Sequence, residues 1–466
     1  MGLRFDVDTL VDEQKLGLFN FNLFLWSFLA MFADGYDLQV MAFAAPELVR
    51  VWHIPPAELR LALVASLLGI VFGALLLGYV GDRFGRRRAI VLGCLTYGVT
   101  TLAMLAVGNA DQAALLRFFT GVGLGGLMPN TIALNAELSP KRWRATLIVL
   151  MFLGITLGSV LPGAVTATLV DRHGWQILFL IGGLAPLAIA AGVALFLPES
   201  IKLLAGHPGR RFELLRTARR LRSQLHVPDD ADFHIVRTAA AAGTGLRQIY
   251  APGLAPISAL LWALFATALL TNFFLNSWLP LIFTQSGLAW HEAALAATWY
   301  HIGATLGGIV VSLVLDRFGI LIIAVLFALA APCIAAIGLP GHSFAVLATL
   351  LALSGFTVVG SIFGINATAG MLYATEFRSK GVGWAFAFGR VGSIAGILLG
   401  GALVARKLPM PELFLAPAIP MLVGTAAAVA MIVFAYRRFG GFKVDDRPAT
   451  VTQTSASTAA GSSRYS

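Results

Sequence analysis

The chain has 466 residues, of which 58% are hydrophobic and only 12% are charged, with a formal net charge of +10 and 32 phenylalanines. Soluble globular proteins carry about 25% charged residues, so the composition excludes a soluble enzyme, a disordered chain and a secreted disulfide scaffold. Lipid is the solvent that it predicts for most of the chain.

Twelve apolar runs are long enough to cross a hydrocarbon core of ~30 Å, which takes about 20 residues as a helix. They fall at 18–45, 61–82, 89–107, 112–136, 145–170, 175–197, 257–285, 292–315, 320–340, 343–370, 381–403 and 412–437. We therefore predict an all-α integral membrane protein with twelve transmembrane helices in two six-helix bundles, at 18–197 and 257–437. The remaining parts are an N-terminal segment at 1–17, a central loop at 198–256 and a Ser/Thr/Ala-rich, disordered tail at 438–466.

The basic residues predict the orientation. With the N-terminus inside, the short inner loops carry ten Lys and Arg residues and the outer loops carry five, which places both termini in the cytoplasm. In the central loop, RRFELLRTARRLRSQL forms a basic amphipathic helix that lies against the inner leaflet or is a solvated linker. Membrane lipid is a predicted partner. Nucleic acid is not, because the basic residues are spread out and form no compact binding module.

Two stretches of the first half recur in the second. LLLGYVGDRFGR is echoed by IVVSLVLDRFG, which aligns Asp82 with Asp316. NAELSPKRWRAT is echoed by YATEFRSKGVGW, which aligns Glu137 with Glu376. Two six-helix halves related by a parallel repeat are the arrangement expected of a rocking transporter.

The loop between the second and third predicted spans carries GYVGDRFGRRR at 78–88. This G-x-x-x-D-R-x-G-R-R pattern resembles the best-known loop motif of the major facilitator superfamily. The echo at Asp316 and Arg317 fits this superfamily too, as does LPES at 197–200, which closes the sixth predicted span. The resemblance implies a cytoplasmic gate latch, in which Gly78 and Gly85 permit close helix approach and a tight turn. Simple positive-inside anchoring is the alternative, although it would need neither Asp82 nor the glycines. The predicted gating residues are Gly78, Asp82, Arg83, Gly85, Arg86, Arg87, Glu137, Arg142, Asp316, Arg317, Glu376 and Arg378.

Charged residues also fall inside the predicted spans, at Asp34, Asp37, Arg117 and Arg390. Each costs roughly 2.5–3.5 kcal/mol at the bilayer centre, so we expect them to be paired or to line a wet cavity. Asp34 and Arg117 reach similar heights in a ~30 Å core. We therefore predict that Arg117 neutralises Asp34 or Asp37, either as part of the transport path or as a purely structural ion pair.

The motif MFADGYDLQ in the first span narrows the resemblance. Together with RFFTGVGLGGLMPN and YATEFRSKGVGWAFAFGRVGSIAGILLGG, it is similar to the aromatic acid:proton symporters, bacterial inner-membrane carriers of benzoate-, 4-hydroxybenzoate- and protocatechuate-type acids. The resemblance implies that Arg390 holds a substrate carboxylate, unless it pairs with a structural carboxylate. It makes Asp34 and Asp37 the candidates for proton coupling.

Other polar side chains in the spans are candidates for substrate or proton contacts. His301 is either a proton relay, a donor to a ring hydroxyl or a satisfied interior histidine. Five asparagines either bind ring substituents or form interhelical hydrogen bonds: Asn130, Asn135, Asn272, Asn276 and Asn366.

The predicted function is proton-coupled uptake of an aromatic carboxylate by a monomer, with protons as the second partner and no cofactor beyond the proton gradient. An enzyme is not predicted, because the chain has no H-E-x-x-H, C-x-x-C or Walker-type motif. No metal site is predicted either. Symport of another small organic anion or polar solute is the alternative, and a chemoreceptor-like membrane sensor is a further one.

Overall fold

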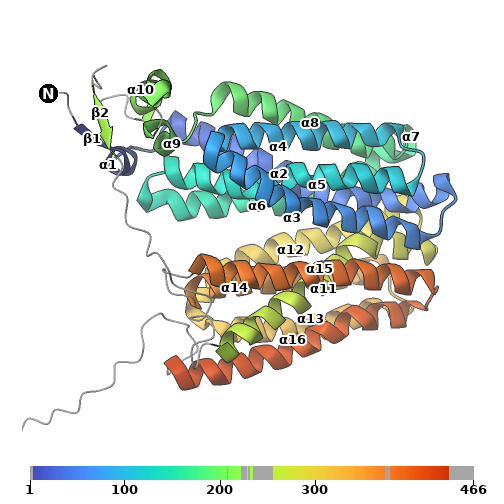
Figure 1. The fold of residues 1–466 in the computed structure, drawn as a ribbon. Coiled ribbons are helices and arrows are strands. Elements are labelled where there is room, and N and C mark those ends of the chain that lie inside the picture. The colour runs from blue at the N-terminus through green and yellow to red at the C-terminus, as the bar shows by residue number, and fades with distance from the viewer. Residues whose placement is uncertain are drawn as a thin grey trace, which may run out of the picture.

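The computed structural model describes residues 4–206, 208–221, 228, 231–234, 255–372 and 378–439. Figure 1 shows long helices that run side by side in two groups. The N-terminal half holds α2 (Leu18–Trp52), α3 (Leu59–Phe84), α4 (Arg86–Ala103), α5 (Ala110–Leu138), α6 (Lys141–Val165) and α8 (Gln176–Phe196). The C-terminal half holds α11 (Ala255–Gln285), α12 (Trp290–Phe318), α13 (Ile320–Ile337), α14 (Phe344–Leu372), α15 (Arg378–Ala405) and α16 (Met410–Phe439).

In the described part of the chain, 11 helices are long and apolar enough to cross a membrane. The exception among the helices above is α5, which has 29 residues but includes Arg117, Asn130, Asn135 and several glycines. These residues lower its hydropathy. The predicted spans agree with the helices in position, but α2 continues to Trp52, well past its predicted end at 45.

The two halves are packed alike. In each half the second helix packs on the fourth, the first on the fifth, and the third on the sixth, for example α3 on α5 and α12 on α14. Glycines allow the closest of these approaches, because a Cβ at Gly121 would overlap the Ser66 carbonyl and one at Gly303 would overlap the Ala352 carbonyl. This shared packing matches the internal repeat of the sequence.

One end of the helix bundle carries the N-terminal segment and the start of the central loop (Figure 1). We call it the α10 end, after the helix α10 (Arg211–Leu221), and it also holds α1 (Val7–Asp12) and α9 (Ile201–Ala205). Here β1 (Arg4–Asp6) pairs in parallel with β2 (Asp232–His234), with Phe5 opposite Phe233. The all-α prediction did not include this short sheet, which joins segments more than 220 residues apart.

The amphipathic helix predicted in the central loop is α10, and its apolar face is buried by protein. Leu214, Ala218 and Leu221 pack in one core with Leu10 and Leu204. This face is therefore not available to lie in a leaflet, which corrects that alternative. The tail from residue 440 and most of 222–254 lie outside the described residues.

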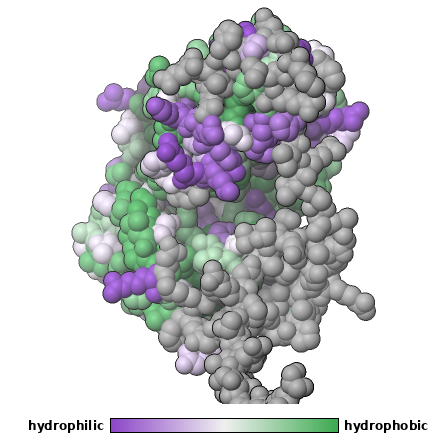
Figure 2. All heavy atoms as spheres, turned by 90° about the vertical axis from the view of Figure 1, so that its left-hand side faces the viewer, coloured by the Kyte–Doolittle hydropathy of each residue, from purple (hydrophilic) through white to green (hydrophobic). Residues whose placement is uncertain are grey.

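The two halves meet at the end opposite to α10. One hydrophobic core includes residues of both halves, among them Phe43 and Leu63 with Trp278 and Tyr300. A second core, toward the α10 end, consists of residues of the N-terminal half and its attached segments. Figure 2 looks onto the α10 end and shows hydrophilic side chains above a hollow between the halves. The molecule is thus closed at the opposite end and open at the α10 end.

Candidate functional site

A buried ion pair joins α2 to α5. The Arg117 guanidinium donates from Nη1 to Asp37 Oδ1 at 2.7 Å and from Nη2 to Asp37 Oδ2 at 2.8 Å. Nη2 also lies 3.3 Å from Ser66 Oγ on α3. Asp37 is 0% and Arg117 3% exposed. Asp37 is therefore the partner of Arg117, and two parallel hydrogen bonds fix its geometry.

Asp34 lies one helical turn away from Asp37 on α2 but has no such partner. Its side chain is 8% exposed and makes no hydrogen bond or ion pair with another described residue. Arg390, on α15 in the other half, is half-buried and interacts electrostatically with Asp34 without a direct ion pair. A carboxylate and a guanidinium thus attract each other across the two halves, and neither is neutralised by a contact within its own half in the described structure.

His301 lies where the halves meet. Its ring is 6.2 Å, between centroids, from the ring of Phe43 on α2 and is 4% exposed. No hydrogen bond joins its ring nitrogens to another described residue. The preceding Tyr300 donates its hydroxyl to Asn272 Oδ1 at 2.9 Å. His301 is therefore not a histidine satisfied by neighbouring groups, whereas Asn272 is held by a tyrosine of its own half.

Two of the predicted asparagines tie helices together. Asn130 donates from Nδ2 to the Leu77 carbonyl of α3 at 3.0 Å. Asn135 donates from Nδ2 to Ser27 Oγ of α2 at 2.7 Å. Both are almost fully buried. The geometry favours the interhelical alternative for this pair.

The remaining two of the five asparagines, Asn276 and Asn366, form no hydrogen bond to another helix in the described structure. Asn366 donates to the Ile362 carbonyl one turn back in its own helix, at 2.7 Å. Asn276 has a buried Oδ1 with no hydrogen-bond donor among the described residues.

The predicted gate residues of the N-terminal half form a charge network at the α10 end. Asp82 pairs with Arg86 one turn later, and Arg86 Nε lies 3.8 Å from a Glu137 oxygen. Glu137 also accepts a hydrogen bond from Ser200 Oγ. The network therefore joins α3, α4, α5 and the start of α9 within one half.

Gly85 forms the turn that this network needs. Its φ is +123°, and a Cβ there would overlap the carboxylate of Glu199. The Arg87 backbone N–H donates to Glu199 Oε1 at 3.1 Å, and the Arg87 side chain donates to the Ala194 carbonyl. The close helix approach expected at Gly78 is not found in this structure, because a Cβ there would meet nothing within 4 Å. The gating role of Gly78 stays a prediction.

Glu199 is a site residue that was not among the sequence-based candidates. Its signal in the sequence is the LPES motif at 197–200, which fits the superfamily without pointing to a role for the glutamate. Among the remaining gate candidates, Arg83 and Arg317 lie over the rings of Phe84 and Phe318, and Arg142 is exposed. Glu376 and the side chains of Asp316 and Arg378 lie outside the described structure. The part of the network predicted for the C-terminal half therefore stays a prediction.

Two halves with like packing, a shared closed end and opposite charges facing each other across the halves are typical of a transporter. Residues 27–376 match the Major Facilitator Superfamily. The chain belongs to this superfamily. It is a multi-pass protein of the bacterial inner membrane and not an enzyme.

Named relatives indicate which family within the superfamily the chain resembles. The chain is 31% identical over 434 residues to a gallate transporter of Pseudomonas putida, covering 93% of this chain and 96% of that protein. It is 33% identical over 435 residues to the 4-hydroxybenzoate transporter PcaK of Pseudomonas aeruginosa, covering 91% and 95%. These relatives confirm the resemblance to the aromatic acid:proton symporter family.

Solved structures share the fold. The D-xylose-proton symporter is 17% identical with a TM-score of 0.64, covering 89% of this chain and 97% of that one. The xylose transporter XylE from E. coli, in a partially occluded inward open conformation, is 15% identical with a TM-score of 0.62, covering 90% and 98%.

Proposed function

We propose that the chain takes up an aromatic carboxylate together with a proton by alternating access. The observation that carries the proposal is the placement of Asp34 and Arg390 on opposite halves, where each influences the other electrostatically without a hydrogen bond or ion pair between them. A guanidinium in this position has the geometry and charge to bind a carboxylate with two hydrogen bonds. A carboxyl group opposite it has the chemistry to carry a proton.

The proposed architecture has twelve spans, with α5 as the twelfth, in bundles at 18–197 and 257–437. Both termini and the central loop are cytoplasmic in this proposal, so the α10 end faces the cytoplasm and the cleft is open inward. The excess of basic residues in the loops of that end supports this orientation. One chain contains both walls of the cleft, which is why a monomer suffices.

In the proposed cycle, the ion pair between Asp37 and Arg117 stays closed and holds α2 against α5. A substrate carboxylate bound at Arg390 brings its negative charge close to the carboxylate of Asp34, and the two negative charges repel each other. A proton on Asp34 removes that repulsion, so substrate and proton are bound together. The proton gradient then drives uptake without any cofactor.

An aromatic carboxylate is the proposed substrate class, because gallate and 4-hydroxybenzoate in the relatives' names both combine a ring with a carboxylate. Uptake of labelled 4-hydroxybenzoate into proteoliposomes under an imposed pH gradient tests it. We expect hydroxybenzoates to compete, and aliphatic acids and D-xylose to compete poorly. Equal competition by aliphatic acids would point to the alternative, a carrier of another organic anion.

The proton step is tested with Asp34→Asn. We expect this variant to lose accumulation driven by the pH gradient while it still exchanges labelled for unlabelled substrate, because exchange needs no net proton movement. Asp111→Asn is the matched control, since Asp111 is exposed at the start of α5. Accumulation at the wild-type level in Asp34→Asn would show that Asp34 does not carry the proton.

A further inference from the structure

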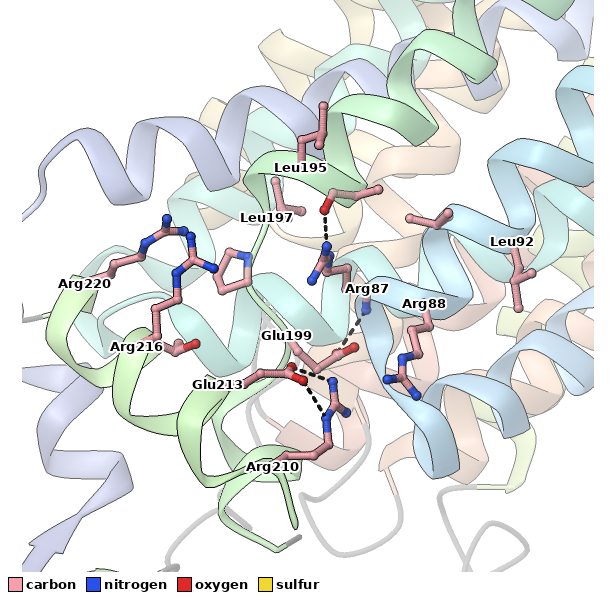
Figure 3. A pocket seen from close by; sticks show the side chains of 14 residues that line it. Arg87, Arg88, Leu92, Leu195, Leu197, Glu199, Arg210, Glu213, Arg216 and Arg220 are labelled. Atoms are coloured by element: carbon pink, nitrogen blue, oxygen red, sulfur yellow. Dashed lines mark hydrogen bonds and ion pairs between the residues drawn. The ribbon is translucent and has the colours of Figure 1, made fainter. Parts of the chain in front are cut away.

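A pocket of about 670 Å³ lies at the α10 end, lined by α4, the end of α8 and α10 (Figure 3), and no residue of the C-terminal half lines it. Its charged lining is mainly basic, with five arginines against two glutamates. These residues are Arg87, Arg88, Arg210, Arg216, Arg220, Glu199 and Glu213. Arg87 and Glu199 belong to the gate turn described above, whereas Arg88, Arg216 and Arg220 have no role in the proposed transport cycle.

Two of the five arginines already have partners. Arg210 donates to both oxygens of Glu213, at 2.7 and 3.3 Å, and this hydrogen bonding lowers the pKa of the Glu213 carboxyl. Arg87 is held by the Ala194 carbonyl, as described above. Arg88, Arg216 and Arg220 are exposed and make no hydrogen bond or ion pair with another described residue. Their charge is the part of the lining that is not compensated by direct contacts.

The arrangement of these arginines favours an anion with several oxygens. Arg216 and Arg220 lie one turn apart on α10, where like charges destabilise a helix. In Figure 3 their head groups extend in the same direction, while Arg88 comes from α4 on the other side of the pocket. A phosphate can accept hydrogen bonds from guanidinium groups on both sides and removes the repulsion.

The rest of the wall is apolar. Leu92, one turn after Arg88 on α4, is 47% exposed, and Leu195 on α8 is 74% exposed. Both belong to helices long and apolar enough to cross the membrane, so these exposed side chains are available to contact an acyl chain. The pocket therefore passes from arginines to lipid-exposed leucines, as a phospholipid passes from headgroup to acyl chain.

We propose that this pocket binds the headgroup phosphate of an anionic phospholipid, with Arg88 on one side and Arg216 and Arg220 on the other. An acyl chain lies over Leu92 and Leu195. Because the apolar face of α10 packs on protein, its basic face is the one that meets the lipid. The bound lipid thus fastens the central loop to α4.

The test uses the full chain, delipidated in detergent and titrated with phosphatidylglycerol or phosphatidylcholine, with bound lipid counted by native mass spectrometry. We expect wild type to prefer phosphatidylglycerol. Each arginine near an anionic headgroup contributes about 1 kcal/mol, so the double variant R216Q/R220Q should bind it about 30-fold more weakly. Arg88→Gln, on a different helix, should lose about fivefold.

The control is R211Q/R219Q, which removes the same charge from the same helix at positions that do not line the pocket. It should keep wild-type affinity, and melting temperatures in phosphatidylcholine verify folding. Equal losses in R216Q/R220Q and R211Q/R219Q, or unchanged binding in Arg88→Gln and R216Q/R220Q, would overturn the proposal. Displacement of phosphatidylglycerol by millimolar inorganic phosphate would assign the pocket to free phosphate and also overturn it.

Discussion

Removing both partners of the Asp37–Arg117 ion pair should cost less stability than the sum of the two single removals. The pair is almost completely buried and makes two short hydrogen bonds. Arg117→Gln leaves the Asp37 carboxylate buried without its counter-charge, which costs about 3–5 kcal/mol of unfolding free energy. The double variant D37N/R117Q buries two neutral amides instead. It should regain about 2 kcal/mol relative to the sum of the single losses.

Reversible unfolding in mixed detergent micelles measures this coupling in a double-mutant cycle. The control is the same cycle on Glu47 and Arg50, which also pair on α2 but with the Arg50 side chain 74% exposed. That pair should show little coupling, because water screens it. Additive losses at Asp37 and Arg117, or equal coupling at the two pairs, would refute the assignment of a buried, mutually neutralising pair.

Three further results are expected. Gly85→Ala should lower stability by about 1–2 kcal/mol because of the positive φ at this position. Gly78→Ala is the control and should not lower it, because Gly78 faces open space. Thermal unfolding of both variants measures this, and equal losses would contradict the role of Gly85 in the turn. Asn130→Ala should cost about 1–3 kcal/mol of stability because it removes two buried hydrogen bonds, to the Leu77 and Gly126 carbonyls, with the uptake KM unchanged. A raised KM at unchanged stability would instead make Asn130 a substrate contact. Trp290→Phe removes the hydrogen bond from Nε1 to the Phe43 carbonyl, which joins the two halves at the closed end. If this bond holds the halves together, a cysteine introduced at Thr298 should react faster with a thiol reagent in the variant. An unchanged rate would show that this contact does not hold the halves together.

The sequence predicted the helical architecture well because the cost of burying polar groups in lipid leaves a strong and local signal. Each apolar run can be identified directly from the local composition, and both repeated motifs are recognisable in the sequence. The short sheet between β1 and β2 could not be predicted, because its strands are three residues each and far apart in the chain. The burial of the α10 apolar face escaped prediction for a related reason. An amphipathic pattern shows that a face is apolar but not what covers it.

The site residues divide in the same way. The cost of charge in a membrane singled out Asp34, Asp37, Arg117 and Arg390 from the sequence alone. Only the tertiary structure decided that Asp37 takes Arg117, since residues three apart on a helix share a face and height alone does not distinguish them. It likewise decided that Asn130 and Asn135 tie helices together and that Glu199 closes on the Gly85 turn.

What the sequence by itself determined is therefore the solvent of the chain, the course of its spans and the identity of the charges that lipid would reject. These follow from transfer free energies, which depend on composition and position along one helix. The tertiary structure decided which charge is neutralised and which stays open toward the other half. That choice depends on distances between helices, which no single helix encodes.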